Sequence, residues 1–129
     1  MKASDDRGSV SAFVLGLVMT FVACAGLAVD GGRLVTARVR VSDLAENAAR
    51  VGAQAITDIR LGTPSVDRER ATRITAKFLG ESGAVGSVSA NRFEVCVVVS
   101  ETVRMAVLNL VGVSARHVSS RRCARPIVG

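Results

Sequence analysis

Val10–Val29, VSAFVLGLVMTFVACAGLAV, is the stretch of sequence that decides the fold, because it contains no charged side chain. About 20 uncharged, mostly apolar residues are what a helix needs to cross the hydrocarbon of a bilayer. Charges lie immediately outside the stretch, from Asp5 to Arg7 before it and at Asp30 after it. We therefore predict a membrane-spanning helix over residues 10–29, preceded by a short polar leader over residues 1–9.

Two other interpretations of this stretch are weaker. A cleaved secretory signal has an apolar region of ~7–15 residues that ends at a small-residue cleavage site. This stretch is longer, and its candidate Ala23-Cys24-Ala25 lies inside it. A lipoprotein attachment at Cys24 needs an apolar-small-small-Cys pattern, which Phe21-Val22-Ala23-Cys24 fits poorly. We expect a retained span in which Cys24 packs as a small apolar side chain.

Small side chains recur at every fourth residue along the predicted span. That spacing places them along a helix face, where helix backbones can approach closely in lipid. Chance in a segment rich in Ala and Gly is one explanation, and lateral packing against other membrane helices is the functional one. This helix-packing stripe consists of Ala12, Gly16, Thr20, Cys24 and Ala28.

The pattern over residues 30–62 predicts that the span continues as a membrane-proximal amphipathic helix. Apolar residues spaced three and four apart form a heptad-like seam dominated by Ala and Val. The seam either covers a sheet of the same domain or serves self-association. We expect one long helix that ends near Arg60-Leu61-Gly62, with a bend permitted at Gly31-Gly32. The seam residues are Leu34, Ala37, Val41, Leu44, Ala48, Val51 and Ala55.

Residues 63–129 predict a small α+β domain packed with the 30–62 helix. Thr63-Pro64-Ser65 is typical of a helix start. Alternation with period two then predicts an antiparallel sheet in which Phe93, Val95, Val97 and Val99 share one face. The expected strands are 85–90, 93–101 and 113–124, the last at an edge. The predicted fold class is α+β: a long N-terminal transmembrane helix continuing into an amphipathic helix, a second helix and a small antiparallel three-stranded sheet.

Composition argues against several classes of function. The chain has 129 residues, a formal charge of +6, four Phe and neither Trp nor Tyr. Nucleic acid is not expected as a partner because no aromatic platform is present on which bases could stack. His117 is the single histidine, and we expect it to be exposed, so no metal site is predicted. We predict no catalytic residues and no cofactor, and hence not an enzyme.

Cys96 and Cys123 fall in the second and third predicted strands. If these strands run antiparallel with Cys96 opposite Cys123, then Glu101 faces Val118 and the two Cβ atoms lie near bridging distance. A disulfide there would stabilise the domain by ~2–4 kcal/mol and would require an oxidising compartment outside the cytoplasm. The alternative is two unpaired thiols on different faces.

Three segments, in this order, carry a resemblance to a known family. They are RGSVSAF at residues 7–13, GLAVDGGRL at residues 26–34 and AENAARVGAQA at residues 45–55. Together they are similar to the TadE/TadG-like minor pseudopilin family of the Flp (Tad) pilus system. The resemblance implies a cytoplasmic N-terminus, a single span in the cell membrane and an extracytoplasmic C-terminal domain. The Lys and Arg residues on the two sides of the span are close to a tie and do not favour either orientation.

The resemblance also implies specific sites and partners. In the TadE branch a prepilin peptidase cuts after a Gly that matches Gly8, which would leave Ser9 as the first residue. That branch has Glu at the position of Phe13, so this chain is closer to the TadG-like variety. Implied partners are membrane lipid, pilus subunits or the inner-membrane secretion platform, and a second copy of the chain. Asp30 lies at the membrane boundary, where we expect it either to pair with Arg33 or a partner's basic residue, or simply to be a helix-end charge among headgroups.

The function predicted from these features is a membrane-anchored, pseudopilin-like component in the assembly or structure of a Flp/Tad-type pilus or related secretion system. The alternative is a cell-envelope binding protein, unrelated to pili, whose basic outer domain meets anionic polymer.

Overall fold

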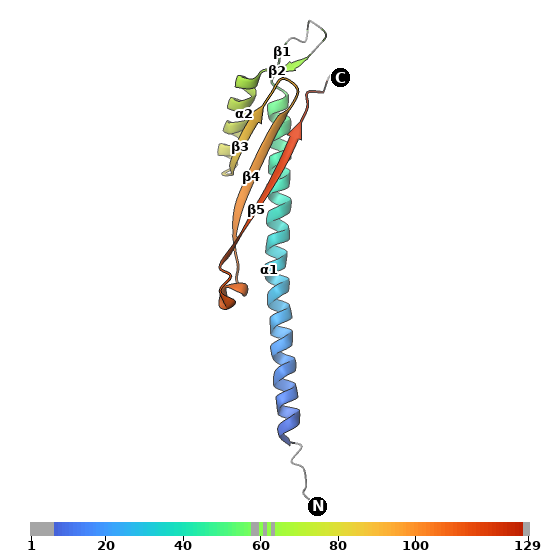
Figure 1. The fold of residues 1–129 in the computed structure, drawn as a ribbon, viewed down its shortest axis with the longest axis vertical. Helices are drawn as coiled ribbons and strands as arrows, with labels where there is room; N and C mark the ends of the chain where they lie inside the picture. The colour runs from blue at the N-terminus through green and yellow to red at the C-terminus, as the bar shows by residue number, and fades with distance from the viewer. Residues whose placement is uncertain (1–6, 58–59, 61, 63, 128–129) are drawn as a thin grey trace, which may run out of the picture.

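The computed structural model describes residues 7–57, 60, 62 and 64–127. One long helix runs the length of the molecule, and a small α+β unit packs along its C-terminal half (Figure 1). The predicted α+β class is confirmed. In chain order the elements are α1 (Arg7–Ala53), β1 (Ile56–Thr57), β2 (Ser65–Val66), α2 (Arg68–Glu81), β3 (Val85–Ala90), β4 (Val95–Arg104), the 3₁₀ helix η2 (Leu108–Val111) and β5 (Ala115–Ala124).

Helix α1 is continuous through Gly31-Gly32, where the sequence permitted a bend. It ends at Ala53, so the prediction of a helix reaching Arg60-Leu61-Gly62 is wrong. The chain turns there because the Ala55 N–H donates to the Gly52 carbonyl, and Ile56–Thr57 then pairs with Ser65–Val66. Of the predicted end, Leu61 lies outside the described residues.

Helix α2 begins later than predicted, since Ser65 belongs to strand β2 and Thr63 lies outside the described residues. Asp67 is the N-cap, and its side chain accepts a hydrogen bond of 3.0 Å from the Arg70 N–H. Such a cap satisfies one of the free N–H groups of a first helical turn. The helix ends at Glu81, and Gly83 follows with a φ of 64°.

The three-stranded sheet has the order β3-β4-β5, and both pairs are antiparallel. Cys96 lies opposite Cys123 and Glu101 opposite Val118, which is the register that the sequence argument assumed. Strand β5 is an edge strand, as predicted. Strand β4 starts two residues later than expected because the Asn91 side chain accepts the N–H groups of Phe93 and Glu94, which extends the turn.

Both helices cover the same face of this sheet: α1 lies over β4 and β5, and α2 packs against β3 and α1. Val95, Val97 and Val99 point into the core from β4, whereas Phe93 is 77% exposed, so its predicted place on that face is wrong. The seam of α1 fills the other side of the core with small side chains. Its buried members include Ala37, Val41 and Ala48, together with the neighbouring Ala45 and Ala49.

The seam is therefore occupied by the sheet of its own domain, which decides between the two interpretations left open by the sequence. The contact is close near the C-terminal end of α1 because a glycine lies there. A Cβ on Gly52 would overlap the Thr75 hydroxyl and would lie 2.9 Å from a methyl of Val95. The α1 backbone can thus approach both α2 and β4 at one point.

Candidate functional site

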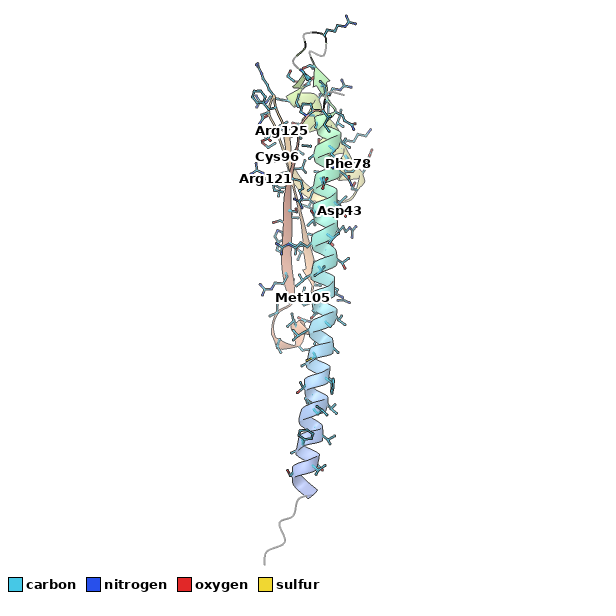
Figure 2. All side chains as sticks on the ribbon, turned by 90° about the vertical axis from the view of Figure 1, so that its right-hand side faces the viewer. Asp43, Phe78, Cys96, Met105, Arg121 and Arg125 are labelled. Atoms are coloured by element: carbon cyan, nitrogen blue, oxygen red, sulfur yellow. A yellow bond between two sulfur atoms is a disulfide. The ribbon has the colours of Figure 1, made fainter. Side chains whose placement is uncertain are left out.

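The N-terminal half of α1 extends away from the sheet, and its side chains project into open space (Figure 2). Large apolar side chains are exposed there, among them Phe13, Met19 and Phe21 at 70%, 69% and 68%. Among the described residues this is the one helix long and apolar enough to cross a membrane, and only 6% of its most apolar 18-residue stretch is buried. A soluble protein's core helix would be mostly buried. An all-apolar, unburied helix surface needs lipid or another protein around it.

All five residues of the helix-packing stripe are exposed on this part of α1. The Thr20 hydroxyl donates to the Gly16 carbonyl at 2.8 Å, so its polar group is satisfied within the helix. Cys24 is a free, exposed cysteine. No Cβ built on Gly16 would meet another atom within 4 Å. The stripe is thus available for a second helix.

Asp30 has a role that the sequence did not reveal. Its carboxylate is fully buried and accepts three backbone N–H groups from the loop between β4 and β5. One oxygen accepts from Ala106 at 2.7 Å, and the other accepts from Val107 at 2.9 Å and from Leu108 at 2.7 Å. Hydrogen bonds to an ionised acceptor are among the stronger ones in proteins. We call this arrangement the Asp30 clamp.

The clamp changes the acidity of Asp30. The N–H groups of Leu108 and Ala106 lower the pKa of the carboxyl, and burial opposes them by raising it. The net direction is downward from 3.8, with Val107 and then Arg33 making smaller contributions. Asp30 is therefore an anion at neutral pH whose charge is matched by backbone dipoles. A pairing with Arg33, one of the expectations from the sequence, is not what holds the Asp30 carboxylate. Asp30 is not a helix-end charge either, because α1 continues for 23 residues beyond it.

Gly26, one turn before Asp30, is the second point of contact with this loop. A Cβ on Gly26 would overlap the side chain of Val107. Gly26 is buried, although its neighbours Ala25 and Leu27 are exposed. Gly26 and Asp30 together hold the β4–β5 loop against α1. Figure 1 shows this loop beside α1. The sequence signal for this pair is its spacing: Gly26 and Asp30 are four residues apart and therefore share a helix face.

Cys96 and Cys123 form a disulfide between β4 and β5 at the end of the sheet farthest from the clamp. Glu94 lies beside this bridge, and its carboxylate and the two sulfurs are close enough together to surround one metal ion. Both sulfurs are already bonded to each other, so they are not available as thiolate ligands. Glu94 instead faces the Arg125 guanidinium at 3.7 Å.

Two arginines of the protein make contacts between α1 and the sheet. The Arg122 guanidinium donates to the Ser42 hydroxyl at 2.8 Å and 3.1 Å, which ties β5 to α1. The Arg40 side chain approaches Glu101 at 4.0 Å. Arg121 is exposed on the sheet face that the helices leave open. His117 is exposed, as predicted.

Gly8 and Ser9, the predicted peptidase site, lie in the first turn of α1. Both are exposed. Nothing in the geometry tests cleavage between them, so it stays a prediction. Arg33 is exposed on α1 one turn beyond Asp30.

These features define a class of protein: a single apolar N-terminal helix that carries a compact α+β unit on its far half, which fits a single-pass membrane protein. Residues 8–55 match the model of the family described as putative Flp pilus-assembly TadE/G-like. The resemblance to that family is thereby confirmed over this segment, and it supports a role related to the Tad pilus. No curated protein and no solved structure gives a significant match to the chain.

Proposed function

We propose that the chain is a membrane-anchored, pseudopilin-like component in the assembly or structure of a Flp/Tad-type pilus or a related secretion system. The observation that carries this proposal is that the family match coincides with helix α1. The match at residues 8–55 covers both the unburied apolar half of α1 and the half that packs on the sheet. The role is one of assembly rather than catalysis.

The mechanism is association in two zones. Residues 10–29 lie in the cell membrane, where the exposed small residues of the stripe allow another helix to pack closely. The α+β unit, which α1 joins rigidly to residues 10–29, contacts pilus subunits or the inner-membrane platform. The N-terminus is cytoplasmic and the unit extracytoplasmic, which is supported by the Cys96–Cys123 disulfide because such bonds persist in oxidising compartments.

In-cell photo-crosslinking tests the association. A photoreactive residue replaces Met19 in the span, and a second variant carries it at Phe93 on the outer unit. Both side chains are well exposed. We expect each variant to capture Tad pilus or platform components, which mass spectrometry identifies. If both variants capture only unrelated envelope proteins, the pilus role is contradicted.

Substitution at the stripe tests the packing mechanism. Gly16→Leu adds a bulky side chain to the stripe, whereas Val18→Leu adds one methylene to a site off the stripe that is 52% exposed. In a strain that lacks the native gene, we expect Val18→Leu to restore pilus assembly and Gly16→Leu to fail. Equal restoration by both variants would remove the stripe from the mechanism.

Two further measurements test processing and orientation. Cleavage after Gly8 predicts a mature protein that begins at Ser9 in the mass spectrum of the membrane-extracted chain, and an intact Met1 or Lys2 terminus rejects it. A reporter that works only outside the cytoplasm should be active when it is fused to the C-terminus. A reporter active only in the cytoplasm would reverse the orientation.

A further inference from the structure

The loop between β4 and β5, residues 105–113, is an uncharged apolar segment at the foot of the sheet. Its sequence is MAVLNLVGV, with Asn109 as the one strongly polar side chain. Leu110 and Val111 at its tip are 84% and 74% exposed. An apolar tip of this kind would be unfavourable in water, so its surroundings need an explanation.

Its position relative to the span supplies one. Val107 contacts α1 at Gly26, which lies three residues, or about 4.5 Å, inside the predicted end of the span. Asp30, at the span boundary, holds the backbone at residues 106–108. The loop is therefore at the level of the bilayer surface whenever residues 10–29 are in lipid. Figure 1 shows it beside the middle of α1, at the opposite end of the sheet from the β3–β4 turn.

The backbone of the loop is also suited to a low-water environment. Unpaired N–H and C=O groups are costly in a membrane, so irregular backbone is tolerated there only when it is satisfied internally. Three N–H groups donate to Asp30, and others donate within the loop or to its flank. Those internal bonds run from Met105 to Ser114, Leu110 to Val107, Gly112 to Asn109 and Val113 to Leu108, each from N–H to carbonyl.

Arginines flank the apolar segment on the side away from the span. Arg104 and Arg116 are exposed at the adjoining ends of β4 and β5, where Arg104 pairs with Ala115 and Arg116 with Val103. Arg33 is exposed on α1 one turn past the clamp. Basic side chains at this level would meet anionic headgroups while the apolar tip lies below them.

We propose that residues 105–113 form a second membrane contact, an interfacial loop that inserts Leu110 and Val111 into the headgroup–acyl boundary of the bilayer beside the span. This inference rests on the membrane anchorage proposed above. The α+β unit then contacts the membrane at two places, through α1 and through residues 105–113. Two contacts fix the tilt and rotation of the unit relative to the membrane. The partner of this surface is lipid, not a further protein.

The test uses the full-length protein in vesicles of phosphatidylethanolamine and phosphatidylglycerol. Cys24→Ser removes the free thiol, and single labelling sites are then introduced as Leu110→Cys, Phe93→Cys and Met19→Cys. All three positions carry exposed side chains, so a polarity-sensitive fluorophore can be attached without disturbing the core. Phe93 is the matched control, because it is a similarly exposed apolar residue at the other end of the same sheet.

We expect the fluorophore at Leu110 to emit at shorter wavelength than at Phe93 and to be quenched by lipids that carry a spin label near the headgroup. The label at Met19 should be quenched best by spin labels deep in the acyl chains. If Met19 is quenched and Leu110 behaves like Phe93, the interfacial loop is refuted while anchorage stands. If Met19 is not quenched either, the anchorage itself fails and the inference fails with it.

Discussion

Asp30 is the residue on which the arrangement of helix and sheet depends most directly. It is fully buried, and its acceptors are saturated by N–H groups that lie 76 to 78 residues away in the sequence. The sequence marked Asp30 as a boundary charge but did not identify its partner, because backbone amides carry no residue-specific signal. Only the folded path of the hairpin brings residues 106–108 to this carboxylate.

Asp30→Asn keeps the size of the side chain but removes its charge and replaces one acceptor oxygen with a donor group. At least one loop N–H then loses its partner, and a donor left unsatisfied is more costly than the bond was worth. We expect amide exchange at residues 106–108 to become faster by on the order of tenfold, with the disulfide end of the sheet unchanged. Unchanged exchange at all three residues would show that the clamp contributes nothing.

The same carboxyl predicts a dependence on pH. Because its pKa in the folded chain is below 3.8, the folded state binds its proton less readily than the unfolded state does. The stabilisation from the clamp is therefore complete above pH 3.8 and is lost as pH falls through the lowered folded pKa. Protection of the amides at residues 106–108, measured against the exchange rate of an unstructured chain at the same pH, should fall in that acid range in the native chain but not in the Asp30→Asn variant. A loss of protection at the same pH in both would assign it to another group.

Gly52 is the residue that sets the distance between α1 and the core. Gly52→Ala would force a methyl group against Thr75 and Val95, and overpacking of this kind costs ~1–3 kcal/mol of the free energy of unfolding. Gly80→Ala is the matched control, because a Cβ there meets nothing within 4 Å and helical Ala is favoured over Gly by ~0.5–1 kcal/mol. Denaturant unfolding in detergent followed by circular dichroism compares the two. Stabilisation by both changes would contradict the close contact.

At the scale of elements, periodicity predicted the long helix, the second helix and the sheet, including the edge position of β5. The register with Cys96 opposite Cys123 was an assumption of the sequence argument, with unpaired thiols as the alternative, and the structure has that register. Element ends were not derivable, since they depend on bonds formed elsewhere. The bond from the Ala55 N–H ends α1 where the apolar pattern would continue the helix. The Asn91 side chain delays the start of β4 where the alternating pattern would begin the strand.

The disulfide joins the two long strands at the end of the sheet remote from the clamp. Replacing both partners, Cys96→Ser with Cys123→Ser, should lower the free energy of unfolding by ~2–4 kcal/mol, because the unfolded chain regains a loop that the bond had closed. Cys24→Ser is the control and should be nearly neutral, since that side chain is exposed outside the core. Thiol counting on the unreduced, denatured native chain should find Cys24 alone. Three reactive thiols would exclude the bond.

At the scale of the whole molecule, α1 has two parts in the proposed arrangement, as the membrane anchor and as the support of the α+β unit. Most side chains of its first half are apolar and exposed, and its second half packs against the sheet and α2 to form the core of the α+β unit (Figure 2). Because the helix is continuous, the unit is rigidly connected to the span rather than tethered by a linker. From Asp30 to Ala53 the helix rises about 35 Å, so with residues 10–29 in a bilayer, as proposed, the disulfide end of the sheet would lie well clear of the membrane surface.

Extraction of membranes from cells that express the full-length chain tests the central claim most directly. If residues 10–29 are held in the bilayer, the protein stays with the membranes through washes in high salt and in alkaline carbonate and is released only by detergent. Recovery of the intact chain in the supernatant without detergent would contradict a membrane-lodged helix, and with it the account of the protein as an anchored assembly component.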